Sequence, residues 1–208
     1  MFRSRKACVA ILLALCAGLL ATLFTVDAAA QVRVVAIGDS NTAGFGVSRN
    51  ENYPSKLERL LRSRGLDVTV RNSGVNGDTS AGGLRRLASA VPEGTAVAII
   101  FFGRNDVRFS VPAARLRSNL DSMVGQLRRR GVAVILCSFH PFNFADIAAR
   151  HGARYCGDFF AGVAVQGLKK PEFSLRDFVP HLNAAGYTVV AGRLAPMVEA
   201  AIRSGRRR

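Results

Sequence analysis

Residue types that acyl-transfer chemistry requires stand far apart in this chain. Ser40 carries a hydroxyl that could attack an ester carbonyl, and His181 carries an imidazole that could take its proton. A serine becomes a good nucleophile beside such a base. Gly77 and Asn105 could, together with the backbone N–H of Ser40, donate hydrogen bonds to the oxyanion of a tetrahedral intermediate. These residue types predict a serine hydrolase, provided that the fold brings them together.

Apolar runs alternate with helical patterns from Val32 onward, which indicates how the chain could position these residues. Continuous apolar runs predict buried strands, and apolar residues that recur every three to four positions predict helices. We expect strands at 32–37, 68–70, 96–102 and 132–137, a faint fifth at 154–156, and helices at 53–64, 83–91, 112–130 and 183–202. Pro196 must either kink the last helix or be tolerated in it. The fold class is therefore α/β, a three-layer α/β/α sandwich with a central parallel sheet of about five strands.

The candidate residues follow predicted strands or precede the last helix. Ser40 follows the first strand, Gly77 the second and Asn105 the third, while His181 stands just before the final helix. In an open α/β sheet, ligands bind outside the carboxyl ends of the strands. Each residue also has a structural explanation, because Ser40 or His181 could cap a helix and the other two could form turns. Their coincidence at successive strand ends favours chemistry.

The segments around these residues resemble the sequence blocks of the SGNH, or GDSL-type, hydrolases. The chain reads Gly-Asp-Ser at 38–40, Asn-Gly-Asp-Thr at 76–79 and Gly-Arg-Asn-Asp at 103–106, and His181 follows late in the chain. The longer stretches 38–46 and 74–83 are similar to the bacterial arylesterase, thioesterase and lysophospholipase branch. The resemblance covers nearly all of residues 31–208 and implies a flavodoxin-like SGNH hydrolase fold.

The resemblance also implies an activity, the hydrolysis of carboxylic ester or thioester bonds through an acyl-Ser40 intermediate. It makes His181 the base and assigns the oxyanion hole to Ser40, Gly77 and Asn105. Lysophospholipid, acyl-thioester and aryl ester substrates fit this branch, whereas related deacetylases release acetate from carbohydrate. A carbohydrate O-acetylesterase and a catalytically weak envelope-binding module on the same fold are the alternatives. Aromatic residues after the strands could line an acyl groove, although packing in the core explains each of them equally well, namely Phe45, Phe109, Phe139, Phe142 and Phe144.

The acid of the expected triad is the point at which this sequence departs from the family pattern. The family places an aspartate three residues before its histidine, but Phe178 stands there and Asp177 lies one residue further back. An exposed loop absorbs one extra residue easily, so we predict that Asp177 reaches the imidazole. The alternatives are a Ser–His dyad supported by a backbone carbonyl and Glu172 as a distant substitute. Arg104 is also unusual in its block and would place a cation near the pocket mouth.

The first thirty residues have the pattern of a secretory signal peptide. Basic residues precede the uncharged apolar run 7–24, and three alanines at 28–30 precede Gln31. This pattern predicts cleavage before Gln31 and a periplasmic or secreted protein without a transmembrane segment after cleavage. The run is just long enough to span a bilayer, so an uncleaved N-terminal anchor is the alternative. Residues 31–208 then form one hydrolase domain with an arginine-rich C-terminal tail.

The charge of the chain narrows the choice of partners. Its 208 residues include 29 Lys+Arg and 14 Asp+Glu, which gives a net charge of +15. The basic residues are not interleaved with aromatic ones in any recognisable nucleic-acid-binding module. We therefore expect a small-molecule or lipid ester substrate, no specific nucleic acid, and an anionic envelope surface as a partner of the basic surface.

The cysteines leave open whether the chain has a disulfide, whereas the spacing of the histidines does not predict a metal site. Cys137 and Cys156 could form a disulfide or stay as two buried thiols, because the sequence does not report the distance between them. The histidines are His140, His151 and His181, and none has metal-ligand spacing with a cysteine or another histidine. We expect neither a metal ion nor a cofactor.

Overall fold

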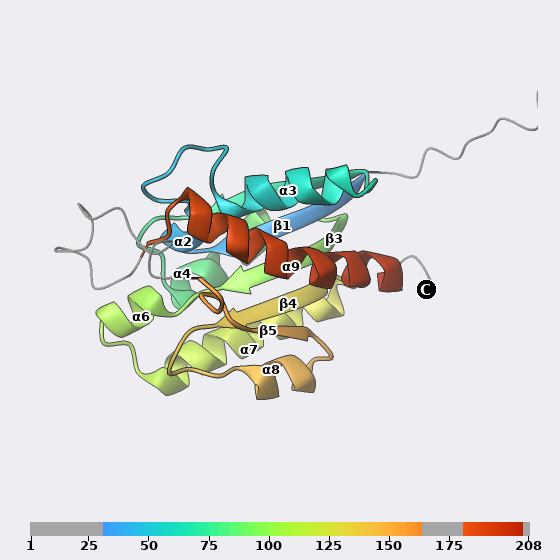
Figure 1. Cartoon of the computed structure of the whole chain (residues 1–208). Helices are drawn as coiled ribbons and strands as arrows, with labels where there is room; N and C mark the ends of the chain where they lie inside the picture. Colours follow the sequence, from blue (N-terminus) through green and yellow to red (C-terminus); the bar gives the residue numbers. More distant parts are fainter. Residues whose placement is uncertain (1–30, 164–180, 206–208) are drawn as a thin grey trace, which may run out of the picture. The chain divides into compact units, whose positions relative to one another are not determined.

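A computed structural model describes residues 31–163 and 181–205 of the chain. Five parallel strands form one sheet in the order β2-β1-β3-β4-β5 (Figure 1). They are β1 (Val32–Gly38), β2 (Val68–Gly74), β3 (Thr95–Phe101), β4 (Ala133–Ser138) and β5 (Arg154–Asp158). The prediction of a parallel sheet is confirmed, including its faint fifth strand. This strand order is flavodoxin-like, and its topological switch point lies between β1 and β3.

Helices cover both faces of the sheet and complete the predicted three layers (Figure 1). On one face lie α3 (Tyr53–Ser63) and α9 (Ala184–Gly205), whose apolar side chains form one core with those of the strands. The other face carries α4 (Ser80–Arg85), α5 (Leu87–Ala90), α7 (Ala113–Arg129) and α8 (Ala145–Arg150), which enclose a second core. The sheet therefore separates two apolar cores.

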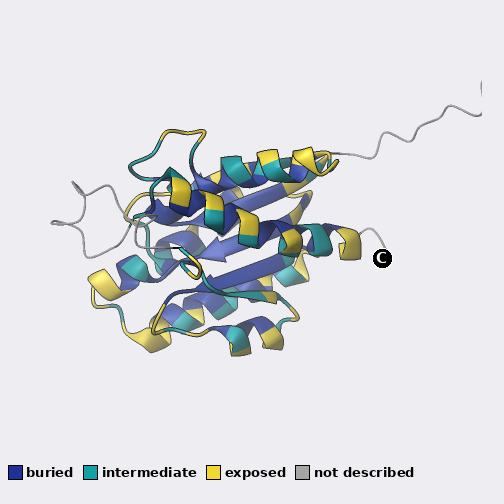
Figure 2. Cartoon of the chain, viewed as in Figure 1, coloured by how far each residue is buried: buried dark blue, intermediate teal, exposed yellow. Residues whose placement is uncertain are grey.

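The strands supply side chains to both cores in alternation. Val34 and Ala36 of β1 belong to the core beneath α3 and α9, whereas Val35 and Ile37 belong to the other. All four are fully buried, which explains why the sequence shows a continuous apolar run rather than an alternating pattern. Figure 2 shows the same distribution, with buried strands and with exposed residues on the outer sides of the helices.

Short helices account for most differences from the predicted elements. The sequence predicts neither α2 (Ser40–Ala43) nor α6 (Arg104–Arg108) nor α8, because segments of four to six residues are too short to show helical periodicity. The predicted helix 83–91 is two helices that meet at Arg86. The first of them begins at Ser80, where Thr79 Oγ1 accepts a hydrogen bond from the N–H of Gly82 at 3.2 Å. Pro196 is tolerated inside α9.

A disulfide joins Cys137 of β4 to Cys156 of β5, with the two Cα atoms 5.0 Å apart. It fastens the edge strand β5 to its neighbour and answers the question that the sequence leaves open. Cys137 is fully buried, whereas Cys156 is half-buried. Cys137 therefore belongs to the core beneath α9, and Cys156 packs against that core.

Loss of this disulfide is expected to lower the free energy of unfolding by about 3 kcal/mol, because its 19-residue separation no longer restricts the unfolded chain. Thermal unfolding of the Cys137→Ala/Cys156→Ala double variant should show a midpoint lower by roughly 5–10 °C. The double variant also loses packing at position 137, so the wild type in reductant provides the matched comparison. Unchanged midpoints in both samples would contradict this prediction.

None of the helices formed by the described residues has the length and apolar character needed to cross a bilayer. The predicted signal peptide at residues 1–30 lies outside the described residues, as do the last three arginines of the tail. The boundary before Gln31 therefore stays a prediction.

Candidate active site

Ser40 opens the short helix α2 directly after β1, at the carboxyl edge of the sheet. The turn requires glycine at position 38, because a Cβ there would lie 2.2 Å from Thr42 Oγ1 and 2.5 Å from the carbonyl oxygen of Phe101. Only 6% of the Ser40 surface is exposed. A tightly packed turn therefore fixes the serine beside the topological switch point, where this class of sheet binds ligands.

Asp39 lies buried beside Ser40 and caps α2. Its Oδ1 accepts a hydrogen bond from the backbone N–H of Asn41 at 2.9 Å, whereas no described residue donates to its Oδ2. Burial raises the pKa of Asp39 to about 7, although the Asn41 hydrogen bond and the charge of Arg104 oppose this effect. The carboxyl group supports the serine turn and is partly protonated at neutral pH.

Asp39→Asn is expected to stabilise the fold at high pH by up to about 4 kcal/mol. The pKa of Asp39 lies above its ordinary value of 3.8 in the folded chain, so between about pH 4 and pH 7 the folded state binds more protons than the unfolded state. The stability contributed by this group therefore falls as pH rises through that window. Asparagine keeps the acceptor for Asn41 and removes the titration.

Thermal unfolding at pH 5 and pH 8 would test this expectation. The difference between Asp39→Asn and the wild type should be large at pH 8 and small at pH 5. Asp67→Asn, at an exposed aspartate, is the control and should change neither value. A variant less stable than the wild type at both pH values would contradict the assignment.

His181 lies against Ser40 although 141 residues separate them in sequence. Its Nε2 is 2.8 Å from Ser40 Oγ, which is hydrogen-bond distance. The ring of Phe45 packs against the imidazole with centroids 4.8 Å apart. Asn183 then caps α9, because its Oδ1 accepts a hydrogen bond from the N–H of Gly186 at 3.0 Å. In this arrangement an imidazole can take a proton from a serine hydroxyl.

Gly77 and Asn105 share one cavity with the serine and the histidine. The cavity has a volume of about 190 Å³ and is lined by Ser40, Phe45, Asn76, Gly77, Asn105, Arg108 and His181. Gly77 has a φ of 76°, in the left-handed region that favours glycine. Asn105 Nδ2 donates to the carbonyl oxygen of Asp78 at 2.9 Å, which holds the amide beside the Gly77 loop. An amide and backbone N–H groups fixed in this way are donors suited to an oxyanion.

A buried hydrogen-bond network lies behind Asn105, and the sequence does not predict it. The carboxylate of Asp106 accepts hydrogen bonds from the hydroxyl and the N–H of Ser80, the latter at 2.9 Å. Asn119 Nδ2 donates to the Ser80 hydroxyl at 2.9 Å. The network joins α6, α4 and α7, so Asp106 fixes the helix that carries Asn105. The only sequence signal for it is Asp106, the one acidic residue of the Gly-Arg-Asn-Asp block.

Arg86 is a second positioning residue that sequence reasoning does not identify. Its Nε donates to Asp78 Oδ2 at 2.8 Å, Nη1 to the carbonyl oxygen of Ser73 at 2.8 Å, and Nη2 to that of Gly38 at 3.0 Å. One guanidinium thus ties the end of β1 to the end of β2 and to the loop behind Gly77. Two of its three acceptors are backbone oxygens, and because every residue has one, the sequence gives no signal for these contacts.

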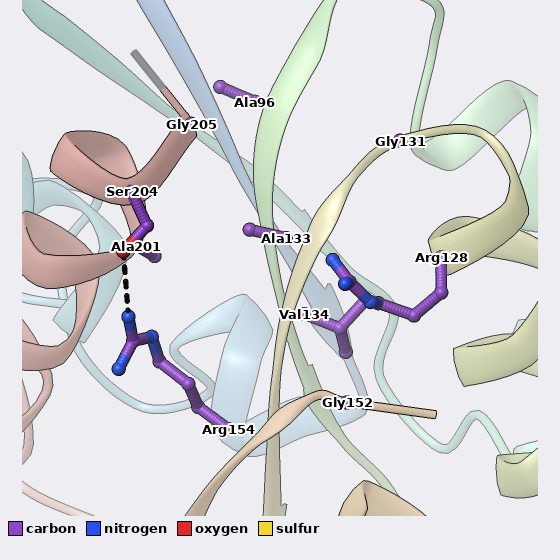
Figure 3. A pocket seen from close by; sticks show the side chains of 10 residues that line it. All are labelled: Ala96, Arg128, Gly131, Ala133, Val134, Gly152, Arg154, Ala201, Ser204 and Gly205. Carbon is purple, nitrogen blue, oxygen red and sulfur yellow. Dashed lines mark hydrogen bonds between the residues drawn. The ribbon is translucent and has the colours of Figure 1, made fainter. Parts of the chain in front are cut away.

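A cavity at the opposite edge of the sheet has a structural role (Figure 3). It lies near the beginnings of β3, β4 and β5 and the end of α9. Arg154 Nη2 donates to Ser204 Oγ at 3.2 Å, and Arg128 donates to the carbonyl oxygens of Val132 and His151 at 3.0 and 3.1 Å. Both guanidinium groups hold residues at the ends of helices and strands, at the edge of the sheet opposite Ser40.

The candidate aromatic residues have different surroundings. Phe45 lines the cavity that holds Ser40, and Phe139 and Phe142 line a neighbouring one. Phe144 is buried in the core beneath α7, while Phe109 is 59% exposed. Of the five residues, Phe45 therefore shares the cavity of Ser40, whereas Phe139 is buried and belongs to the core beneath α9.

The acid of the expected triad lies outside the described residues, since Asp177 and the distant substitute Glu172 both fall within 164–180. Among residues 31–163 and 181–205, no group of three or more His, Cys, Asp or Glu side chains is arranged to hold a metal ion.

Comparisons with known proteins show the family to which this chain belongs. The family model of the GDSL-like lipase/acylhydrolase family matches residues 36–189. Esterase TesA of Pseudomonas aeruginosa is 35% identical over 161 residues, 76% of each chain. An arylesterase of Vibrio mimicus is 30% identical over 144 residues, 68% of this chain and 69% of the relative. A crystal structure of TesA superposes with a TM-score of 0.72 at 27% identity, covering 81% of this chain and 99% of that one. The chain therefore belongs to the GDSL-like lipase/acylhydrolase family, the SGNH hydrolases, and is an enzyme that hydrolyses ester bonds.

Proposed function

We propose that Ser40 is the nucleophile of this esterase and that His181 is its general base. The 2.8 Å separation of Ser40 Oγ and His181 Nε2 carries the proposal. The hydroxyl oxygen attacks the ester carbonyl while its proton passes to the imidazole. The N–H groups of Ser40 and Gly77 and the amide of Asn105 donate hydrogen bonds to the oxyanion.

The reaction then proceeds through an acyl-enzyme. When the tetrahedral intermediate collapses, the imidazolium of His181 gives its proton to the leaving alcohol or thiol, and an ester of Ser40 forms. Water attacks that ester, again with His181 as base, and releases the carboxylic acid. Asp177 orients the imidazole and stabilises its charged form.

Carboxylic esters and thioesters are the substrate class that we assign. The names of the two relatives, esterase and arylesterase, support esters, and an aromatic wall at Phe45 supports an acyl or aryl group over a small polar one. We place lysophospholipids, acyl-thioesters and aryl esters within this class. A carbohydrate O-acetylesterase would instead prefer acetyl over octanoyl esters. Comparing the rates at which the enzyme hydrolyses an acetyl ester and an octanoyl ester would therefore distinguish the two alternatives.

We further propose that the enzyme works in the periplasm or outside the cell. The signal-like pattern at residues 1–30 supports export, and the disulfide between Cys137 and Cys156 suits an oxidising compartment. Analysis of the N-terminus of the mature protein would test cleavage before Gln31. Salt-sensitive binding to anionic vesicles would test an envelope surface as partner.

Covalent trapping tests the proposed mechanism directly. An organophosphonate that mimics the tetrahedral intermediate should inactivate the enzyme with one adduct per chain, located at Ser40 by peptide mass spectrometry. An activated aryl ester should give a burst of phenol before steady turnover if deacylation is slow. An adduct on another residue would overturn the assignment of Ser40.

Asn105→Ala is expected to lower kcat by about 10²–10³-fold with little change in KM, because the amide contacts the oxyanion only as charge develops. Asn50→Ala, at an exposed asparagine, is the matched control and should retain full activity. Steady-state kinetics with one aryl ester would measure both. A rise in KM at constant kcat would instead indicate that Asn105 binds the ground state.

A further inference from the structure

Among the residues that the structure describes, only three large apolar side chains are exposed, and all three lie close to the proposed active site. They are Val75, Val107 and Phe109, with 45, 52 and 59% of their surface exposed. Val75 lies two residues before Gly77, which lines the cavity of Ser40, and Val107 lines a larger cavity next to it. Exposed apolar side chains that gather at one place mark an interaction surface, whereas single scattered ones do not.

Hydrogen bonds hold the segments that carry these side chains next to each other. The carbonyl oxygen of Val75 accepts a hydrogen bond from the N–H of Asp78 at 3.2 Å, which closes a turn. The carbonyl oxygen of Asp78 in turn accepts from Asn105 Nδ2 on α6 at 2.9 Å. Helix α6 carries Val107 and is capped by Phe109. All three side chains therefore lie at the edge of the sheet where the strands end (Figure 1).

The chain at the end of α6 satisfies its own backbone hydrogen bonds. Three successive N–H groups donate to carbonyl oxygens of the preceding turn at 2.9, 3.0 and 2.8 Å, those of Phe109, Ser110 and Val111. Ser110 has a φ of 55°, the left-handed conformation that commonly ends a helix in this way. Pro112 has no N–H group to satisfy. This segment can therefore enter an apolar environment without bringing unpaired backbone donors into it.

The composition of residues 107–112, which we call the apolar tip, suits a negatively charged lipid surface. They read Val-Arg-Phe-Ser-Val-Pro, and all except Val111 are exposed. The acidic residues that flank the tip in sequence are Asp106, which is buried against Ser80, and Asp121. The chain as a whole has 29 Lys+Arg against 14 Asp+Glu. Apolar side chains and a positive net charge together favour binding to anionic lipids.

A second copy of the chain fits this surface less well than a membrane does. Three exposed apolar side chains are far fewer than the roughly 20–30 residues that each partner contributes to a stable protein interface. Two copies would also bring equal positive net charges together. An anionic membrane needs no large complementary surface, because a few inserted side chains and charge attraction add up to binding.

We propose that the apolar tip and Val75 dock on the surface of an anionic phospholipid membrane, with Val107 and Phe109 inserted among the lipids. The edge of the sheet that carries Ser40 then faces the membrane. An ester held in the bilayer can reach the serine without first being released into water. This inference rests on the proposed ester hydrolysis at Ser40 and on the proposed envelope partner, and it assigns the surface that binds this partner.

The chain contains no tryptophan, so a single introduced tryptophan reports where it meets lipid. Phe109→Trp places the reporter in the apolar tip, and Ser63→Trp places it at an exposed position of α3, at the opposite edge of the sheet. Each protein is mixed with vesicles of phosphatidylcholine and phosphatidylglycerol, with or without brominated acyl chains. The emission of the Phe109→Trp protein should shift to shorter wavelength and be quenched by bromine, whereas that of the Ser63→Trp protein should do neither.

Vesicle sedimentation measures how much each part of the surface contributes to binding. Phe109→Ser should lower binding by about tenfold, because moving a phenyl group out of water is worth at least this much. Arg115, whose N–H donates to the carbonyl oxygen of Pro112 at 2.8 Å, is exposed beside the tip. Arg115→Gln should lower binding by about fivefold. Arg154→Gln removes the same charge from an exposed position at the opposite edge and should bind like the wild type.

The other outcomes overturn one proposal or the other. Unchanged emission of the Phe109→Trp protein, while the wild type hydrolyses a soluble aryl ester, would reject the docking surface and leave Ser40 as nucleophile. Equal losses of binding in both arginine variants, with none in Phe109→Ser, would show general attraction by the net charge and reject the surface. A shift that grows with protein concentration without vesicles would make a second copy the occupant and reject the membrane. Vesicle binding without hydrolysis of any ester would reject the proposed function and leave the docking surface.

Discussion

Ser40→Ala is expected to lower kcat by about 10⁶-fold while the fold stays intact, since removal of a serine nucleophile has an effect of this size in other serine hydrolases. The alanine removes the oxygen that lies 2.8 Å from His181 Nε2, and no acyl-enzyme can then form. The oxyanion donors stay in place, so slow hydrolysis by water should persist above the uncatalysed rate. Initial rates with an activated aryl ester would measure the loss.

Two further variants test whether the loss of activity is specific to the proposed role of Ser40. Ser63→Ala, at an exposed serine on α3, should keep wild-type activity and exclude a general effect of lost hydroxyl groups. A Ser40→Ala/His181→Ala double variant should be hardly slower than Ser40→Ala alone, because the two residues act as one unit. Full activity in Ser40→Ala, or strictly additive losses in the double variant, would contradict the proposed mechanism.

Asp177→Asn is expected to lower kcat by about 10⁴-fold, because an asparagine beside the imidazole favours the wrong tautomer and cannot stabilise its charged form. The expectation depends on an extra residue in the loop before His181 that still lets the carboxylate reach the ring. Steady-state rates of Asp177→Asn and of Glu172→Gln, each relative to the wild type, would test it. The two substitutions remove one charge each and leave the side-chain shape almost unchanged.

The comparison of these variants decides which residue supports the histidine. A large loss in Asp177→Asn alone is the expected result. A large loss in Glu172→Gln alone would make Glu172 the acid. Near wild-type rates in both would indicate a Ser–His dyad supported by a backbone carbonyl.

The sequence predicts the sheet well because buried parallel strands leave an unmistakable apolar pattern. Residues 32–37 and 96–102 are predicted within one residue of the observed β1 and β3 at each end. The end of β2 is missed, since Arg71 and Asn72 are exposed and polar although they pair with β1. The break at Arg86 is also missed, because a mixed Gly-Leu-Arg segment gives no sign of where a helix divides.

The candidate site is predictable to the extent that it lies at strand ends. Ser40, Gly77 and Asn105 follow successive strands, and a parallel sheet brings such positions to one edge whatever lies between them. Positioning residues are harder to predict, because the bonds of Arg86 to two carbonyl oxygens depend on three-dimensional proximity alone. The same holds for the pairing of Cys137 with Cys156, which only coordinates can reveal.

The chain that follows β4 has an implication for how such enzymes diversify. Residues 139–142 line a cavity of about 420 Å³ next to the cavity of Ser40, yet Ser40, Gly77, Asn105 and His181 all come from other segments. Phe139 belongs to the core beneath α9 and lies edge-on to Phe101, whereas His140 and Pro141 are exposed. Substitutions at the two exposed positions can therefore change the surface beside the cavity while the packing of the core and the proposed nucleophile and base are preserved.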